Sequence, residues 1–261
     1  MDAESAIAPE EWLARYFEFL GGPPSAYLVI DVETTGGSYR DTLATQLGFA
    51  LAEDSAVIAS EDLIADWTTL PGVGRTWFYD RLERTARAMA HTGKAYATPP
   101  HVMRKHGIPW DEAMDAFYDI LDLAADQDLY FVGHNAWAFD RPILDRLFAL
   151  LPEGRQFSFD RIHLIDTGLI EKAMTHGLSF PTPAYTSLGQ WNNAIQHIGN
   201  KGKWNLHGHC AEKYSIAVDH ALAHASAAYD CRVAAALLEC YKDIACRDTS
   251  NIKTRPRSPR P

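Results

Sequence analysis

The chain has 261 residues, of which 47% are hydrophobic and 22% charged. This length and composition are typical of one globular α/β domain with insertions, rather than of two small domains. The apolar runs are too short to cross a bilayer, so no membrane association is expected. The first residues are acidic where a secretory signal would be positive, which predicts an intracellular, cytoplasmic protein.

The charges are distributed unevenly along the chain. The formal net charge is −10, although proteins that bind nucleic acid usually depend on Lys and Arg for phosphate affinity. Residues 75–105 are rich in Lys and Arg with aromatic residues between them, whereas residues 111–128 carry acids and no base. Two interpretations stay open: two solvated helix faces of opposite charge, or a nucleic-acid contact patch within residues 75–105.

The first half of the chain predicts one helix followed by three strands. A helix is expected at residues 9–20, with Pro9 in its first turn and a Gly-Gly-Pro sequence after it. Apolar runs predict strands at 27–30, 43–51 and 56–64. Three successive strands indicate an antiparallel meander.

The second half alternates strands with helices. An Arg-rich helical insertion at about residues 66–108 precedes a helix at 110–124, in which Met114, Phe117 and Leu121 recur at helical spacing. The later predicted elements are strands at 129–132 and 160–167 and helices at 142–150, 187–198, 205–214 and 227–244. The fold class is therefore α/β, with a mixed sheet that continues the antiparallel meander with parallel strands and is flanked by helices.

These elements divide the chain into three parts. Residues 1–25 form an N-terminal helical extension, and residues 26–246 form the main domain. Residues 247–261 are basic and proline-containing with little that could pack, so a disordered tail is expected.

A pair of carboxylates follows the first predicted strand. Asp31 and Glu33 are two residues apart, so their side chains emerge on one face of the strand and could bind a cation together. Such a triplet alone is usually a solvated strand end. The apolar strand before it and the turn Thr34-Thr35-Gly36-Gly37 after it favour a site.

Two further stretches carry candidate site residues. His134, Asn135, Trp137 and Asp140 follow the strand at 129–132, at the end of a sheet where α/β proteins gather ligands. The alternative is that Asn135 caps a turn and Asp140 begins the next helix. In the third stretch, His224 precedes Asp230 at the start of a long helix. The alternative is that Asp230 only stabilises the N-terminus of this helix through the helix dipole.

Together the three stretches resemble the DEDDh exonucleases, the DnaQ-like family of the ribonuclease H-like superfamily. The resemblance covers roughly residues 26–244 and includes the family's DxET motif, its His-Asn…Asp motif and its AHxA…Asp motif. Lesser similarities are a His-Gly-Ile turn at 106–108 and an Ile-Asp-Thr strand end at 165–167. The main domain is thereby identified as a DEDDh-type exonuclease domain with a ribonuclease H-like mixed sheet.

The resemblance implies a function and a set of site residues. It implies a metal-dependent 3′→5′ exonuclease that releases nucleoside monophosphates from DNA or RNA by a two-metal mechanism. The implied metal ligands are Asp31, Glu33, Asp140 and Asp230, which would hold two divalent cations, Mg²⁺ or Mn²⁺. The implied substrate contacts are Thr34, Thr35, His134, Asn135 and Trp137.

One spacing departs from the family pattern. The family places its general-base His five residues before the last Asp, and here His224 lies six residues before Asp230. A loop position for His224, with Ser226 capping the helix, would absorb the extra residue. His220 is the reserve candidate for the base, and Ser226 occupies the position where a DEDDy enzyme would have Tyr.

The partners and the rival functions remain open. The expected partner is nucleic acid with a free 3′ end, single-stranded by preference, and a homodimer or a polymerase or repair partner is left open. Base stacking could come from Trp137, Tyr39 or Trp204, although aromatic residues in such positions more often pack in a core or a loop. The rivals are a non-catalytic binding module on the same fold and an endonuclease of the ribonuclease H class. A zinc site at His207-Gly208-His209-Cys210 is disfavoured, and these histidines are interpreted as surface or packing residues.

Overall fold

The computed structural model describes residues 7–36, 41–178, 185–198 and 205–252. The stacking candidates Tyr39 and Trp204 lie outside the described residues. In this part of the chain no helix combines the length and apolar character needed to cross a bilayer.

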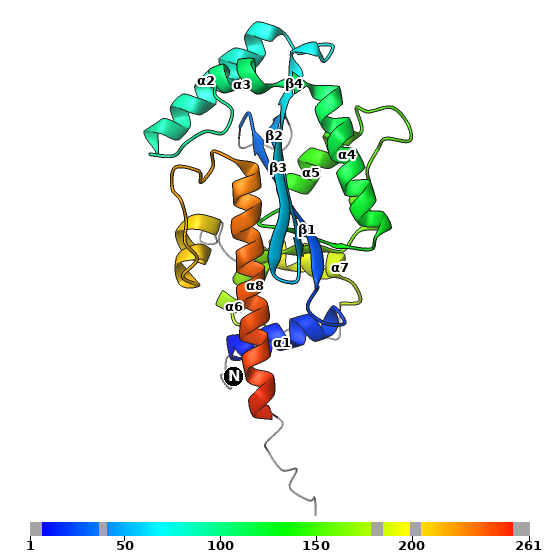
Figure 1. Ribbon diagram of the computed structural model, residues 1–261, viewed down its shortest axis with the longest axis vertical. Coiled ribbons are helices and arrows are strands. Elements are labelled where there is room, and N and C mark those ends of the chain that lie inside the picture. Colours follow the sequence, from blue (N-terminus) through cyan, green and yellow to red (C-terminus); the bar gives the residue numbers. More distant parts are fainter. Residues whose placement is uncertain (1–6, 37–40, 179–184, 199–204, 253–261) are drawn as a thin grey trace, which may run out of the picture.

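An antiparallel meander forms one half of the central sheet (Figure 1). Strands β1 (Ala26–Thr34), β2 (Ala44–Glu53) and β3 (Ala56–Asp66) pair in chain order, each antiparallel to its neighbour. β1 is buried over Tyr27–Ile30, as its continuous apolar sequence requires. The three strands predicted from the sequence are therefore confirmed, each somewhat longer than its apolar run.

Parallel strands complete the sheet. β5 (Tyr130–Gly133) runs parallel to β1, and β6 (Leu164–Asp166) runs parallel to β5. On the other edge, β4 (Ile108–Pro109) pairs parallel with β3. The strand order is β4-β3-β2-β1-β5-β6, which is the mixed sheet that the sequence predicts.

Helices cover both faces of the sheet. One face carries α1 (Pro9–Phe19), α6 (Thr167–Thr175), α7 (Leu188–Gln196) and α8 (Ala227–Ile252). The other face carries α4 (Trp110–Asp126) and α5 (Asp140–Phe148). The alternation of β1 explains the two cores, because Val29 belongs to the first and Leu28 and Ile30 belong to the second.

The Arg-rich insertion forms one end of the molecule. It contains a 3₁₀ turn (Trp67–Thr69), α2 (Arg75–His91) and α3 (Pro100–His106), and it returns to the sheet as β4. Figure 1 shows α2 and α3 together at the end of the molecule opposite α1.

The N-terminal helix is an integral part of the first core. Trp12 and Tyr16 of α1 are almost fully buried, and their rings lie 6.1 and 5.5 Å from that of Trp191 in α7. The indole nitrogen of Trp12 also donates to the carbonyl oxygen of Leu178. The predicted N-terminal helix is therefore present as α1 and packs into the first core.

Three segments differ from the sequence predictions. The helix expected at 205–214 is mainly a π-helix, η3 (Leu206–Ala211), because the N–H of Cys210 donates to the carbonyl of Asn205, five residues earlier. The strand expected over 160–167 is confined to β6, since Asp166 caps α6 directly after it. α8 continues to Ile252, so residues 247–252 are helical rather than part of a disordered tail, and residues 253–261 lie outside the described ranges.

Candidate active site

Four carboxylates from three separate elements line one pocket. Asp31 and Glu33 come from the end of β1, Asp140 is the first residue of α5, and Asp230 lies in the first turn of α8. The pocket has a volume of about 390 Å³. Its remaining lining residues are Val32, His134, Asn135, Phe139, Asn205, Leu206, His207 and His224.

The local geometry of β1 sets the first two carboxylates. Asp31 and Glu33 are half-buried, while Val32 between them is 5% exposed and packs in the core, as alternation along a strand requires. The parallel pairing of β1 with β5 ends at Val29, which leaves the backbone beyond it available to other groups. The N–H of Val32 then donates to the carboxylate of Asp140.

Asp166 holds the loop that carries His134 and Asn135. Its side chain is fully buried and accepts four backbone N–H groups. Oδ1 accepts from Asn135, Gly168 and Leu169 at 2.9, 2.9 and 3.1 Å, and Oδ2 accepts from Trp137 at 2.9 Å. One carboxylate therefore ties this loop to the start of α6. Asn135 is held in the left-handed backbone region, with φ of 62°.

Polar side chains of β2 and β3 hold the start of α8. Ser226 is the N-cap: its Oγ accepts from the N–H of Tyr229 at 3.1 Å and donates to Asp62 at 2.6 Å. Asp62 also accepts from the N–H of Ala228, and Gln46 accepts from the N–H of Ala227 at 2.9 Å. The N-terminal N–H groups of α8 are thereby fixed to the sheet, and Asp230 with them.

His224 lies in the turn ahead of α8, and Ser226 caps the helix as the sequence predicts. The backbone of His224 has φ of 62°, a conformation that places its ring beside the first turn of the helix. Its Nδ1 lies 3.9 Å from Oδ2 of Asp230. The extra residue between His224 and Asp230 is therefore accommodated in this turn.

His207 is a site residue that the sequence reasoning missed. Its side chain lines the pocket and is only 5% exposed, so it is not the surface histidine that the sequence allows, and it packs beside the carboxylates. Its Nε2 lies 2.9 Å from Oδ1 of Asp230, and its ring centroid lies 5.1 Å from that of His224. The His-Gly-His-Cys sequence was the available signal, but its place in η3 is what brings His207 to Asp230. The reserve base His220 is exposed and does not line this pocket.

The carboxylates of the pocket raise one another's pKa values. Burial raises the pKa of Asp31 well above its usual value, and the neighbouring Asp140, Asp230 and Glu33 raise it further. Burial and then Asp230 and Asp140 raise the pKa of Glu33, against a smaller lowering by Lys94. Burial likewise raises the pKa of Asp140, which the N–H of Val32 partly offsets.

The donor set fits bound divalent cations. Asp31, Glu33 and Asp230 each offer an oxygen, and these oxygens lie within 4.8 Å of one another. Oδ1 of Asp230 is buried and has no hydrogen-bond donor among the described residues. Hard oxygen ligands suit Mg²⁺ or Mn²⁺. A bound cation would neutralise the negative charge of these carboxylates.

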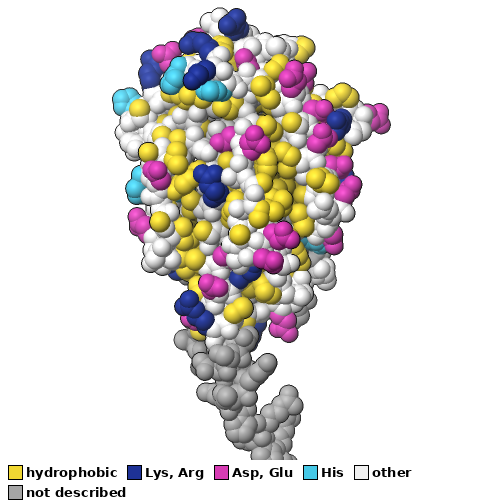
Figure 2. Space-filling view, viewed as in Figure 1, with side chains coloured by type: hydrophobic (Ala, Val, Ile, Leu, Met, Phe, Trp, Pro, Cys, Tyr) yellow, Lys and Arg dark blue, Asp and Glu magenta, His cyan; other side chains and the backbone are white. Residues whose placement is uncertain are grey.

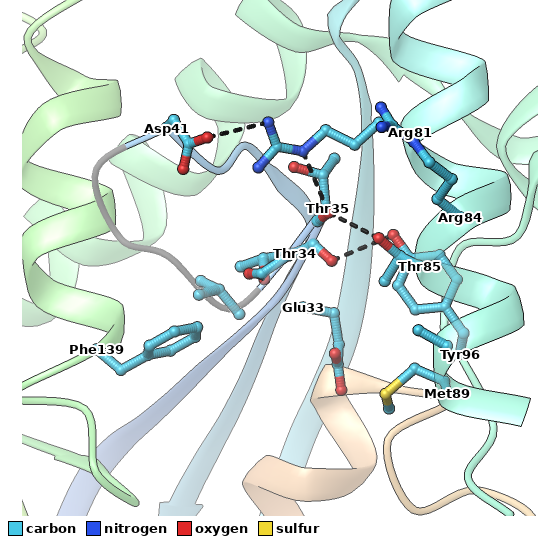
Figure 3. A pocket seen from close by; sticks show the side chains of 13 residues that line it. Glu33, Thr34, Thr35, Asp41, Arg81, Arg84, Thr85, Met89, Tyr96 and Phe139 are labelled. Carbon is cyan, nitrogen blue, oxygen red and sulfur yellow. Dashed lines mark hydrogen bonds and ion pairs between the residues drawn. The ribbon is translucent and has the colours of Figure 1, made fainter. Parts of the chain in front are cut away.

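A second, larger pocket adjoins the carboxylates (Figure 3). It has a volume of about 590 Å³ and shares Val32, Glu33 and Phe139 with the first pocket. Its wall includes Thr34 and Thr35. The residues that α2 and the following loop add are Arg81, Arg84, Thr85, Ala88, Met89 and Tyr96.

Hydrogen bonds fix this wall to the end of β1. The hydroxyl of Thr85 donates to the carbonyl of Thr35 at 2.7 Å, and Nε of Arg81 donates to the same carbonyl at 3.3 Å. The hydroxyl of Tyr96 donates to the carbonyl of Thr34 at 3.2 Å. Figure 3 shows Arg81 extending from α2 to Thr35 at the strand end, with Arg84 nearby on the same helix. The Arg-rich segment thus places cationic groups beside the carboxylate pocket.

Cationic side chains are concentrated at one end of the molecule. Figure 2 shows Lys and Arg side chains gathered at the end of the molecule formed by α2 and α3.

Trp137, a predicted substrate contact, lines neither of the two pockets. Its indole nitrogen donates to Asn193, and the guanidinium of Arg141 lies 4.1 Å from its ring centroid.

The fold is similar to that of a known exonuclease. No protein-family model matches the chain, and no curated protein matches it. The structure of E. coli exonuclease I with a dT13 oligonucleotide aligns with a TM-score of 0.53 at 16% identity, over 88% of this chain and 44% of that chain. The complex with a 5cy-dT13 oligonucleotide aligns with a TM-score of 0.51 at 15% identity, over 88% and 43%. A product-bound structure of exonuclease I gives 0.52 at 16% identity, over 88% and 46%.

This likeness confirms the fold predicted from the sequence. The shared architecture is the ribonuclease H-like mixed sheet flanked by helices. The chain spans less than half the length of these exonuclease I chains.

We predict that Asp31→Asn stabilises the metal-free protein. A carboxyl whose pKa is raised on folding binds its proton more tightly in the folded state, so its ionisation lowers stability as pH rises above the unfolded value of about 4. The melting temperature of Asp31→Asn in EDTA should exceed that of the wild type, and by more at about pH 8 than at about pH 5. Each kcal/mol corresponds to roughly 2–4 °C in a domain of this size.

The same measurement tests the cation site. Mg²⁺ or Mn²⁺ should raise the melting temperature of the wild type and have a much smaller effect on Asp31→Asn. A wild-type melting curve that is indifferent to both ions would contradict the assignment of a cation to these carboxylates.

Proposed function

We propose that this protein is a metal-dependent 3′→5′ exonuclease that hydrolyses the terminal phosphodiester bond of DNA or RNA. The observation that carries the proposal is the meeting of Asp31, Glu33, Asp140 and Asp230 with His224 around one pocket. These residues come from segments up to 199 positions apart, Asp31 and Asp230 being the extremes. The likeness of the fold to exonuclease I, which has been solved with oligonucleotide and with product, supports it.

The carboxylates would hold two divalent cations, Mg²⁺ or Mn²⁺. When bound, such ions stabilise charge on the phosphate oxygens, acidify a water molecule and stabilise the leaving oxygen. Asp31, Glu33 and Asp230 form the group whose oxygens lie close enough to share an ion, and Asp140 adds a fourth carboxylate to the same pocket.

His224 acts as the general base. Burial lowers the pKa of its imidazole, with Asp230 opposing this effect, so the ring is available as a proton acceptor near neutral pH. The imidazole takes the proton of the attacking water as the water oxygen bonds to phosphorus. The bond from phosphorus to the 3′ oxygen of the preceding nucleotide breaks, that oxygen takes up a proton, and a nucleoside 5′-monophosphate leaves.

The adjoining pocket receives the substrate strand. Thr34 and Thr35 line it, while His134 and Asn135 line the carboxylate pocket, so these four residues flank the path to the carboxylates. Arg84 and Arg87 of α2 are exposed, and Arg84 lies in the wall of the pocket. Phosphate groups are attracted to such arginines, and the expected substrate is a single-stranded 3′ end.

The direct test uses end-labelled single-stranded DNA and RNA. With Mg²⁺ or Mn²⁺, the purified protein should shorten strands labelled at the 5′ end stepwise, giving a ladder that EDTA abolishes. Asp230→Asn is the matched inactive control. Binding of both strands without any shortening would instead support a non-catalytic module on the same fold.

A circular single strand separates exonuclease from endonuclease. The proposed enzyme needs a free 3′ end, so a circle should stay intact under conditions in which the linear strand of the same sequence is degraded. Cutting of the circle at a comparable rate would place the protein with endonucleases of the ribonuclease H class.

We predict that His224→Ala lowers the hydrolysis rate about 10²–10⁴-fold, the usual contribution of a general base. The oxygen ligands remain, so the rise in melting temperature with Mg²⁺ should persist. His220→Ala, a histidine exposed in the same loop, is the matched control and should keep wild-type activity. Full activity of His224→Ala would remove this residue from the mechanism.

We predict that replacing Arg84 and Arg87 together by Ala weakens the binding of single-stranded DNA in EDTA. The slope of log affinity against log salt should flatten by about 0.7 for each phosphate that the variant no longer neutralises. Arg161→Ala is the control, because that guanidinium already pairs with Asp122 and Asp126 on another face. Equal salt slopes for the double variant and the wild type would exclude α2 from the substrate path.

A further inference from the structure

The carboxylate pocket contains a second group of potential metal ligands that includes nitrogen. Ring nitrogens of His207 and His224 and an oxygen of Asp230 lie within 4.8 Å of one another. Asp230 belongs both to this group and to the all-oxygen group with Asp31 and Glu33. The proposed function uses the four carboxylates as cation ligands and His224 as the general base, and it assigns no role to His207.

His207 has the surroundings of a ligand rather than of a packing residue. Its side chain is buried, and among the described residues neither ring nitrogen has a hydrogen-bond partner. Nε2 lies 2.9 Å from Oδ1 of Asp230, within ion-pair distance, although the contact lacks hydrogen-bond geometry. A buried imidazole that only packs would be expected to satisfy at least one nitrogen.

The backbone around His207 is built to hold it in this position. Asn205 caps the segment by accepting from the N–H of Gly208 at 2.7 Å, and η3 then turns His207 toward the pocket. The ring is stacked on Tyr229, with centroids 6.3 Å apart and planes inclined by 16°. π-helical segments such as this one are frequent at functional sites.

The donor set selects a class of metal. Two imidazoles and one carboxylate suit borderline transition-metal ions such as Zn²⁺, whereas Mg²⁺ prefers oxygen ligands. Zinc bonds of about 2.0–2.2 Å in a tetrahedral arrangement place ligand atoms roughly 3.3 Å apart. His207 Nε2 lies 2.9 Å from Oδ1 of Asp230 and His224 Nδ1 lies 3.9 Å from Oδ2, so each imidazole is near one of the two carboxylate oxygens.

We propose that His207, His224 and Asp230 form a binding site for one Zn²⁺ ion, which shares only Asp230 with the site for Mg²⁺ or Mn²⁺ on the all-oxygen carboxylate group. Binding at this site does not depend on nuclease activity. Its consequence for activity rests on the proposed function: Zn²⁺ bound to His224 would occupy the nitrogen lone pair of the base and inhibit hydrolysis.

Calorimetric titration of the metal-free full chain with Zn²⁺ alone tests the site. All proteins carry Cys246→Ser, because the Cys246 thiol is exposed and could bind zinc itself. We expect one tight site that a large excess of Mg²⁺ does not displace. Titration with Co²⁺ should give the intense visible absorption of a low-coordinate site with histidine ligands.

Two substitutions of His207 separate ligand loss from loss of packing. His207→Ala and His207→Phe should each weaken Zn²⁺ binding by at least about tenfold, since even indirect supports of a metal site cost that much. His207→Phe keeps a ring against Tyr229, and its melting temperature without metal reports whether the fold is intact. His220→Ala removes an exposed histidine and should leave Zn²⁺ affinity unchanged.

The outcomes are distinguishable from those of the proposed function. Failure of the wild type to bind Zn²⁺, or folded His207 variants that bind it as tightly as the wild type, would overturn the site. Loss of Mg²⁺-dependent activity in His207→Phe with unchanged Zn²⁺ affinity would also overturn it, because His207 would then only position Asp230. Absence of nuclease activity in the wild type would end the proposed function, while the titrations would still decide the zinc site.

Discussion

Mutual repulsion among buried carboxylates is the constraint around which this structure is arranged. Asp31, Glu33 and Asp140 all have raised pKa values, first because each is shielded from water and then because other acids lie beside it. Like charges in a poorly solvated pocket would separate if the chain allowed it. The apolar cores on both faces of the sheet fix the ends of β1, α5 and α8 and hold the acids together. A bound cation would relieve this repulsion.

Buried polar groups supply the accuracy that hydrophobic packing alone cannot. Asp166 accepts four backbone N–H groups and fixes the loop ahead of Asp140. Asp62 and Gln46 accept N–H groups at the start of α8 and fix Asp230. α8 also approaches β2 so closely that a Cβ at Gly48 would overlap Ala227. Directional hydrogen bonds and one close approach at a glycine therefore set the positions of the carboxylates.

The distribution of charge reconciles an acidic chain with a proposed polyanionic substrate. The net charge of −10 is unfavourable for binding phosphates, but α2 presents Arg81 and Arg84 at the pocket beside Glu33. Six of the 34 acidic residues lie on α4, where Asp115 and Asp122 pair with arginines. Interactions between exposed charges decay within about 8–10 Å at physiological salt, so the local cationic wall matters more than the sum.

The sequence by itself determined the mixed sheet and the candidate carboxylates, and the tertiary structure decided which other groups join them. Apolar runs and strand alternation act over a few residues, so β1 with Asp31 and Glu33, and Ser226 as the cap of α8, could be predicted. The place of His207 depends on a π-helical turn, on the register of η3 against α8 and on packing with Tyr229. The positions of Asp62, which accepts from Ser226, and of Trp137, which lines neither pocket, also depend on tertiary packing. Contacts between segments far apart in the chain follow from how whole elements pack, and local spacing does not encode that packing.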